Sequence, residues 1–161
     1  IRNLITKLRK EIPGVILRTT LIVGFPGETE DNFKELCEFV KEYKFDRLGA
    51  FAYSIEEGTP AAKVTDQLDK KTKNKRQSKI MYIQQEVSKE LMKSRIGKEY
   101  TCLIENMTED GEYFIGRTYM DVPSEDGIVY VKYDSSIMVN EFVKVRIIDS
   151  LEYDLIGEVI K

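Results

Sequence analysis

A strand, a glycine turn and a helix start follow one another within residues 17–29, LRTTLIVGFPGET. The odd positions of the strand are Leu, Thr, Leu and Val, whereas the even positions hold Arg18, Thr20 and Ile22. Because successive side chains of a strand point to opposite faces, one face is almost entirely apolar and the other carries a guanidinium and a hydroxyl. The pattern predicts a strand with helices on one face and a polar cavity on the other.

The turn after this strand carries Gly24 and Gly27 on either side of a proline, so the chain can reverse sharply and bring backbone amides close to a ligand. Thr29 is expected to cap the next helix, with Asp31 near the positive end of its dipole. Such turns also occur for geometry alone. Arg18 favours a ligand, since a buried guanidinium needs an anion or several acceptors, but a carboxylate of a neighbouring wall would also serve.

The first 68 residues alternate between helical and strand patterns. Apolar residues at helical spacing precede the strand, and a second amphipathic stretch follows it and ends near Tyr43. Residues 46–54, DRLGAFAYS, then read as another strand. A helix between two strands suits a parallel crossover, and two parallel strands alone cannot cover both faces of a sheet. Residues 1–68 are therefore predicted to be the C-terminal part of a larger α/β barrel.

From residue 96 onward the pattern changes to short strands separated by turns. The five strand-like segments are YTCLIE, YFIGRTY, GIVYVKY, FVKVRIID and LIGEVI. Their number and spacing predict a small five-stranded β-barrel of the oligonucleotide-binding kind over residues 96–161. The formal charge changes at the same point, from +5 over residues 1–95 to −8 over residues 96–161, which supports two domains.

A helix over residues 69–95 is predicted to connect the two parts, with Ile80, Ile83, Val87 and Leu91 on one apolar stripe. Its first turns are strongly basic and contain Lys70, Lys71, Lys73, Lys75, Arg76 and Lys79. Such runs are most often solvated helix faces, which is the interpretation we favour here. Contact with RNA phosphates is the alternative.

The composition limits the chemistry of this chain. With 42% hydrophobic and 33% charged residues and no apolar run of membrane-spanning length, it is typical of a globular domain and predicts no membrane contact. The start at Ile1, without a leader, suggests a cytoplasmic segment cut from a longer protein. Cys37 and Cys102 are interpreted as buried apolar side chains in a reducing compartment. Without histidine, imidazole triads and the commonest zinc sites are excluded, and no catalytic or metal-ligating residue is predicted.

Two segments together carry a family resemblance. LRTTLIVGFPGET and FDRLGAFAYSIEEGTPAA resemble the last two barrel strands of the radical S-adenosylmethionine methylthiotransferases. The β-rich tail, with IGRTYMDVPSEDGIVYV and EYDLIGE, is similar to their TRAM domain. Within that family the segment from Asp46 to Gly49 and the acidic pair Glu56 and Glu57 resemble the RimO type, which methylthiolates an aspartate of a small-subunit ribosomal protein. The MiaB type, which modifies an adenosine of transfer RNA, is the alternative.

The resemblance implies S-adenosylmethionine and two 4Fe–4S clusters as cofactors of the full-length protein. The cysteine ligands of those clusters match no position of this chain, so the chain alone is expected to be inactive. The cofactor-binding residues implied by the resemblance are Arg18, Thr20, Ile22, Gly24 and Phe51. A non-catalytic TRAM or OB-like binding module is a further alternative.

The acidic tail favours a basic ribosomal protein as partner, because a charge of −8 attracts such a protein and repels transfer RNA. The resemblance places a docking surface on exposed strand and loop residues, namely Arg117, Tyr119, Asp121, Asp126, Tyr153 and Asp154. Acidic side chains also keep small barrels soluble, so these residues could serve solubility alone.

Overall fold

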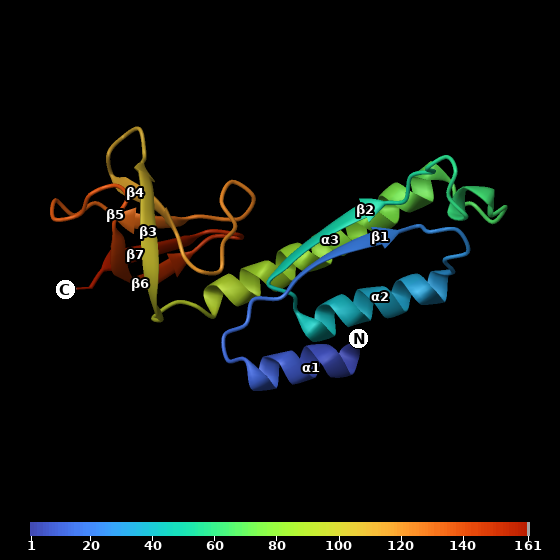
Figure 1. The fold of residues 1–161 in the computed structure, drawn as a ribbon, viewed down its shortest axis with the longest axis horizontal. Coiled ribbons are helices and arrows are strands. Elements are labelled where there is room, and N and C mark those ends of the chain that lie inside the picture. Colours follow the sequence, from blue (N-terminus) through green and yellow to red (C-terminus); the bar gives the residue numbers. More distant parts are fainter. Residues whose placement is uncertain (161) are drawn as a thin grey trace. The chain divides into compact units, whose positions relative to one another are not determined.

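The computed structural model describes residues 1–160 and divides the chain into two compact units, one over residues 1–87 and one from Ser88 onward (Figure 1). The division falls inside the long helix α3, Lys70–Lys93. The domain boundaries expected from the sequence, after residues 68 and 95, stay predictions.

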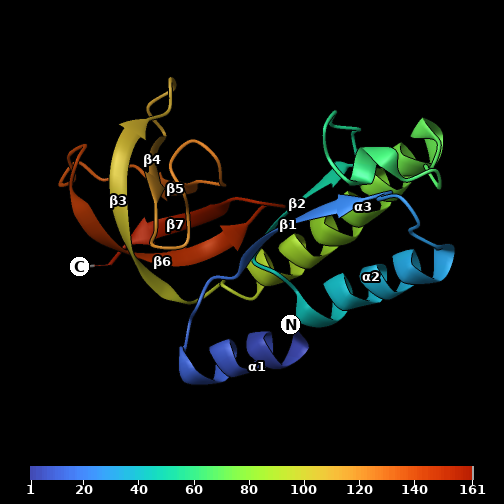
Figure 2. The same cartoon turned by 45° about the vertical axis from the view of Figure 1, so that its right-hand side comes forward.

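The first unit is built as helix, strand, helix and strand, the order that the sequence predicts. Its two strands pair in parallel, and the register runs from Arg18 opposite Arg47 to Val23 opposite Ala52. Figures 1 and 2 show α2 running alongside the two strands. The elements before α3 are α1 Arg2–Glu11, β1 Arg18–Val23, α2 Glu30–Tyr43, β2 Arg47–Ala52 and the short 3₁₀ turn η1 Ala61–Lys63.

Helix α2 begins where the sequence predicts. The Thr29 hydroxyl accepts the Asn32 N–H at 3.1 Å, and the Asn32 side chain accepts the Thr29 N–H at 3.1 Å, which completes a capping box. Glu30 and Asp31 lie in the first turn, near the positive end of the helix dipole. The helix ends at Lys44, whose left-handed φ of 41° terminates the helical hydrogen bonding.

The core of the first unit lies on one face of the sheet. Val23 of β1, Val40 of α2 and Ile80 of α3 are completely buried there. Helix α3 also covers β2: the Gln77 amide donates to the Ala50 carbonyl at 2.9 Å, and the Gln84 amide donates to the Phe45 carbonyl at 2.9 Å. These two side chains give the Ala50 and Phe45 carbonyls hydrogen-bond partners on α3.

The second unit is the predicted five-stranded barrel. Its strands close in the order β3-β4-β5-β7-β6, with β5 and β7 parallel and the other pairs antiparallel. A Cβ on Gly116 would lie 2.5 Å from the Cys102 sulfur, so only glycine fits where β4 crosses β3. The strands are β3 Glu99–Met107, β4 Tyr113–Arg117, β5 Val129–Lys132, β6 Phe142–Ser150 and β7 Leu155–Val159.

Candidate functional site

The even-numbered side chains of β1 lie on the exposed face of the two-stranded sheet. Arg18, Thr20 and Ile22 are exposed, whereas the intervening positions are half-buried or buried under the helices. The register places Phe51 of β2 beside Ile22, and their exposed fractions are 60% and 56%. Four of the five residues predicted to bind the cofactor therefore share one face.

This face combines an apolar end with a cationic end. Ile22 and Phe51 lie near the carboxyl ends of their strands, whereas Arg18 begins β1. Four strand residues span about 13 Å at about 3.3 Å per residue, so a ligand touching both Ile22 and Arg18 must be extended. By the register, Arg47 and Gly49 flank this face as well, which the sequence analysis did not include.

Gly24 lies at the end of this face and is buried. Its backbone is left-handed, with a φ of 71°, which favours glycine. Its N–H donates to the Glu28 carboxylate at 2.9 Å, so this amide is engaged inside the turn. The same carboxylate accepts from Arg76 of α3 at 2.5 Å. The turn is thus held by an ion pair that links it to α3.

The basic run at the start of α3 is not a uniform solvated face. Lys73 is 8% exposed and Arg76 is 6% exposed, and both pack against the turn after β1. The interpretation as a solvated face is therefore wrong for these two residues. The other four basic residues of the run, Lys70, Lys71, Lys75 and Lys79, are exposed.

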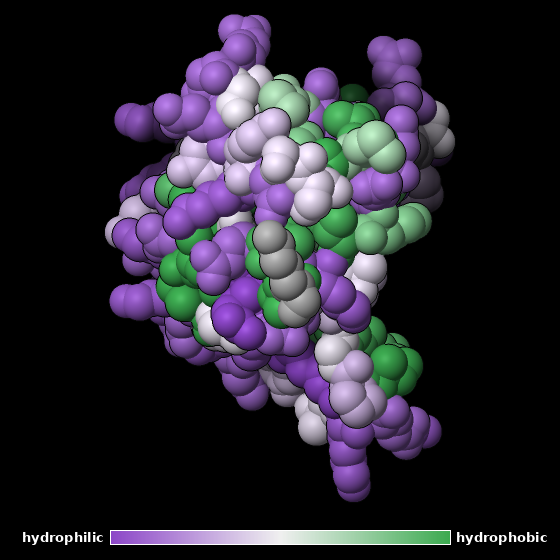
Figure 3. Space-filling model, turned by 90° about the vertical axis from the view of Figure 1, so that its left-hand side faces the viewer, coloured by the Kyte–Doolittle hydropathy of each residue, from purple (hydrophilic) through white to green (hydrophobic). Residues whose placement is uncertain are grey.

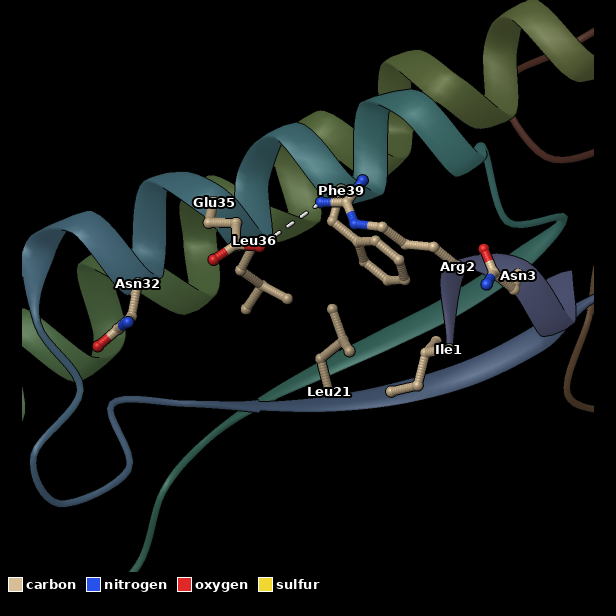
Figure 4. A pocket seen from close by; sticks show the side chains of 8 residues that line it. All are labelled: Ile1, Arg2, Asn3, Leu21, Asn32, Glu35, Leu36 and Phe39. Atoms are coloured by element: carbon tan, nitrogen blue, oxygen red, sulfur yellow. Dashed lines mark ion pairs between the residues drawn. The ribbon is translucent and has the colours of Figure 1, made fainter. Parts of the chain in front are cut away.

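A cavity of about 620 Å³ lies on the covered side of the sheet (Figure 4). In Figure 4 the side chains of Leu21, Leu36 and Phe39 line it, and Arg2 forms an ion pair with Glu35 at 3.6 Å across its edge. Leu21 belongs to the opposite face of β1 from Arg18, Thr20 and Ile22. The cavity therefore contains none of the predicted cofactor residues.

Both cysteines are buried, as predicted, and neither forms a disulfide. They lie in different units, Cys37 in α2 and Cys102 in β3. Burial raises the pKa of Cys37 above its ordinary value and raises that of Cys102 to about 12, so both thiols stay protonated at neutral pH. Within residues 1–160, no group of three or more Cys, Asp or Glu side chains is placed to hold a metal.

The predicted docking residues of the barrel cluster around the loop between β4 and β5 and the turn between β6 and β7. Asp121 accepts the Thr118 N–H at 3.1 Å, Asp126 accepts the Val122 N–H at 2.7 Å, and Asp154 accepts the Ile128 N–H at 2.8 Å. These carboxylates therefore fix the backbone conformation of the loop in addition to giving it negative charge.

The loop and the turn touch each other at Gly127. A Cβ on Gly127 would lie 2.0 Å from the Tyr153 carbonyl oxygen, so the two backbones are in direct contact. Tyr119 and Tyr153 are 67% and 41% exposed and present aromatic surface, whereas Arg117 pairs with Glu105 at 2.7 Å. Figure 3 shows a largely hydrophilic surface with small apolar groups on the side that it views.

No helix among residues 1–160 is long and apolar enough to span a membrane.

Residues 96–160 match the family model of the TRAM domain. Over nearly its whole length the chain is similar to proteins named ribosomal protein uS12 methylthiotransferase RimO. It is 55% identical over 159 residues to the one from Alkaliphilus oremlandii, covering 98% of this chain and 36% of that protein. It is 54% identical over 160 residues to the one from Clostridioides difficile, covering 99% and 36%. The Acetivibrio thermocellus protein is 48% identical over 160 residues, covering 99% and 35%.

These similarities confirm the resemblance to the RimO type. The chain spans just over a third of the length of the relatives that it matches, and the match runs through both units. The relatives are named as methylthiotransferases.

Proposed function

We propose that this chain is the C-terminal part of a radical S-adenosylmethionine enzyme that methylthiolates an aspartate of ribosomal protein uS12. The observation that carries the proposal is the identity of 48% to 55% with uS12 methylthiotransferases across the α/β unit and the barrel together. A shared barrel alone would support only a binding module, because a fold hosts many functions. The similarity of both units favours the enzyme.

The open face of the sheet fits S-adenosylmethionine in its chemistry. Ile22 and Phe51 offer adjacent apolar surface for the adenine ring, and Thr20 offers a hydroxyl between them and Arg18. Arg18 offers a guanidinium for the anionic end of the cofactor. When bound, the cofactor supplies the reactive group, whereas these residues hold and orient it and exclude water.

The iron–sulfur clusters find no ligand set among the residues described here. Cys37 and Cys102 are buried, protonated and in separate units. We therefore expect residues 1–161 alone to bind no cluster and to consume no S-adenosylmethionine. A visible charge-transfer band after anaerobic reconstitution, lost on mutation of either cysteine, would contradict this.

The acidic barrel is proposed to bind the basic ribosomal protein. Its charge of −8 attracts a basic partner over a distance of about one Debye length, which is about 8 Å at physiological salt. Tyr119 and Tyr153 add exposed aromatic surface beside the acidic loop. The exposed lysines at the start of α3 are a separate candidate contact for RNA phosphates.

The decisive experiment uses the full-length protein with reconstituted clusters, S-adenosylmethionine, uS12 and transfer RNA as competing substrates. Mass spectrometry is expected to find one methylthio group on an aspartate of uS12 and none on transfer RNA. Modification of an adenosine instead would overturn the proposal in favour of the MiaB type. An enzyme that modifies neither, although its clusters are loaded, would favour a binding module.

A further inference from the structure

Lys73 of α3 is a largely buried residue that lies beside the carboxyl end of β1. It is 8% exposed, and its side chain packs directly over Gly24, the residue that follows β1. A Cβ on Gly24 would lie 2.5 Å from Cγ of Lys73. The absence of a side chain at Gly24 therefore makes the room that this lysine occupies.

The ammonium of Lys73 reaches an aromatic residue at the end of β2. It lies 4.9 Å from the centre of the Tyr53 ring. The Tyr53 N–H donates to the Val23 carbonyl at 2.8 Å, which extends the parallel pairing beyond β2. By the alternation of a strand, Tyr53 lies on the same face as Phe51. The lysine thus brings its charge to the open face of the sheet.

The carboxylates of Glu28 and Glu30 are engaged with other partners. Glu28 accepts hydrogen bonds from Gly24 and Arg76, and Glu30 pairs with Arg76 at 3.2 Å. Within residues 1–160, the contact that the structure gives the Lys73 ammonium is the Tyr53 ring. An ammonium whose contact is the face of an aromatic ring keeps its three hydrogen-bond donors available for an anion.

Tyr53 adds a buried hydrogen-bond donor to the same place. Among the described residues, its hydroxyl is buried and has no hydrogen-bond partner. The Phe25 and Tyr53 rings pack edge to face, with their centroids 5.1 Å apart. The Lys73 ammonium and the Tyr53 hydroxyl can both donate hydrogen bonds to an anion.

Ligands of α/β folds bind at the carboxyl ends of the strands, which is where these two groups lie. We propose that Lys73 and Tyr53 bind a carboxylate there. This inference rests on the proposed function, which offers two sources: the aspartate of the substrate and the methionyl end of S-adenosylmethionine. Lys73 packs at Gly24, six residues beyond Arg18, so the two residues lie at opposite ends of β1, whose backbone spans about 20 Å over six residues. S-adenosylmethionine has a single carboxylate, so if Lys73 holds that carboxylate, Arg18 does not.

The test measures binding by full-length Lys73→Met and Tyr53→Phe enzymes with reconstituted clusters. Each is titrated with S-adenosylmethionine and with its decarboxylated analogue, and then with a uS12 peptide that contains the aspartate and one that contains asparagine instead. Lys89→Met, an exposed lysine of the same helix, is the matched control.

Lys73→Met is expected to lower the affinity for one of the two carboxylate ligands about tenfold or more and to leave the affinity for its carboxylate-free analogue unchanged. The ligand that responds identifies the source. Tyr53→Phe should weaken the same ligand by a smaller factor and tests the site even if Lys73→Met fails to fold.

Equal affinities of wild type and both variants for all four ligands would overturn the inference. So would an equal loss of affinity for a ligand and its carboxylate-free analogue. Modification of uS12 by the wild type in the same preparations tests the proposed function separately, so the two failures are distinguishable.

Discussion

Arg76 of α3 donates to two oxygens of Glu28, the carboxylate Oε1 at 2.5 Å and the backbone carbonyl at 3.0 Å. The same carboxylate accepts the Gly24 N–H at 2.9 Å. The side chains of Arg76 and Glu28 are only 7% and 13% exposed, so water screens the pair weakly. One carboxylate therefore fixes both the turn after β1 and its contact with α3.

We expect Glu28→Ala to lower the free energy of unfolding by about 3 kcal/mol, because it leaves a buried guanidinium without its main partner. Chemical denaturation of the 161-residue chain measures this loss. Glu30→Ala is the matched control: its side chain is 66% exposed, and its pair with Arg76 should contribute less than about 1 kcal/mol. Similar losses for both variants would show that burial does not decide the strength of the Glu28 pair.

The sequence predicts well what depends on neighbouring residues. The alternation in β1, the Thr29 cap of α2 and the five barrel strands all follow from local periodicity and capping chemistry, and the structure confirms them. The joint placing of Ile22 and Phe51 also follows, because parallel strands in register put equivalent positions side by side.

Burial within the basic run could not be predicted in this way. Arg76 meets Glu28 across 48 residues of sequence, and Lys73 is buried because Gly24 lacks a side chain. Periodicity along α3 cannot reveal either contact, since both depend on how α3 packs against the turn after β1. The hydrogen bonds of Asp121 and Asp126 are local by contrast, since each carboxylate accepts from a backbone amide three or four residues earlier in the same loop.

Substitution of Arg18 tests whether the open face of the sheet binds the cofactor. In the full-length enzyme, Arg18→Leu should weaken S-adenosylmethionine binding by about 2 kcal/mol, or about thirtyfold, through loss of a charge-assisted hydrogen bond. The melting temperature should change little, because Arg18 is on the exposed face. Lys7→Leu on α1 controls for loss of a positive charge. An unchanged dissociation constant together with a lower melting temperature would instead give Arg18 a structural role.

The Cys102 thiol is expected to make the barrel less stable as the pH rises into the alkaline range. Burial first, and then the charges of Asp121 and Glu105, raise its pKa from 9.0 to about 12. Between these values the folded state holds a proton that the unfolded state has lost, so the free energy of unfolding falls as the pH rises from about 9 to about 12. This contribution is fully present below pH 9.

Denaturation of the 161-residue chain at a series of alkaline pH values measures this effect. Cys102→Ala should show a shallower fall than wild type, although it is less stable at neutral pH because the substitution leaves a cavity. Cys37→Ala is the comparison in the other unit, where the rise in pKa is smaller than for Cys102. Identical pH profiles for wild type and Cys102→Ala would rule out a contribution from the thiol.

Variants of the acidic loop of the barrel test whether the substrate is a ribosomal protein or transfer RNA. Asp121 and Asp126 accept backbone hydrogen bonds, so lysine at these positions would disturb the loop as well as its charge. Asparagine keeps an acceptor oxygen and removes only the charge. In the full-length protein we therefore expect Asp121→Asn with Asp126→Asn to weaken uS12 binding about threefold to tenfold and to flatten its salt dependence.

Glu109→Gln with Glu112→Gln removes the same charge from the exposed turn between β3 and β4 and is the matched control. If the acidic residues serve solubility alone, both double variants will bind uS12 as wild type does. If only total charge matters, both will weaken binding equally, because long-range attraction does not depend on position. A loss confined to the Asp121 and Asp126 variant would place the docking surface on this loop.

The wild type gives a second comparison at about 0.15 M salt. If it bound transfer RNA more tightly than uS12, the MiaB type would be favoured, because specific RNA contacts would then outweigh the repulsion between the acidic barrel and the phosphates.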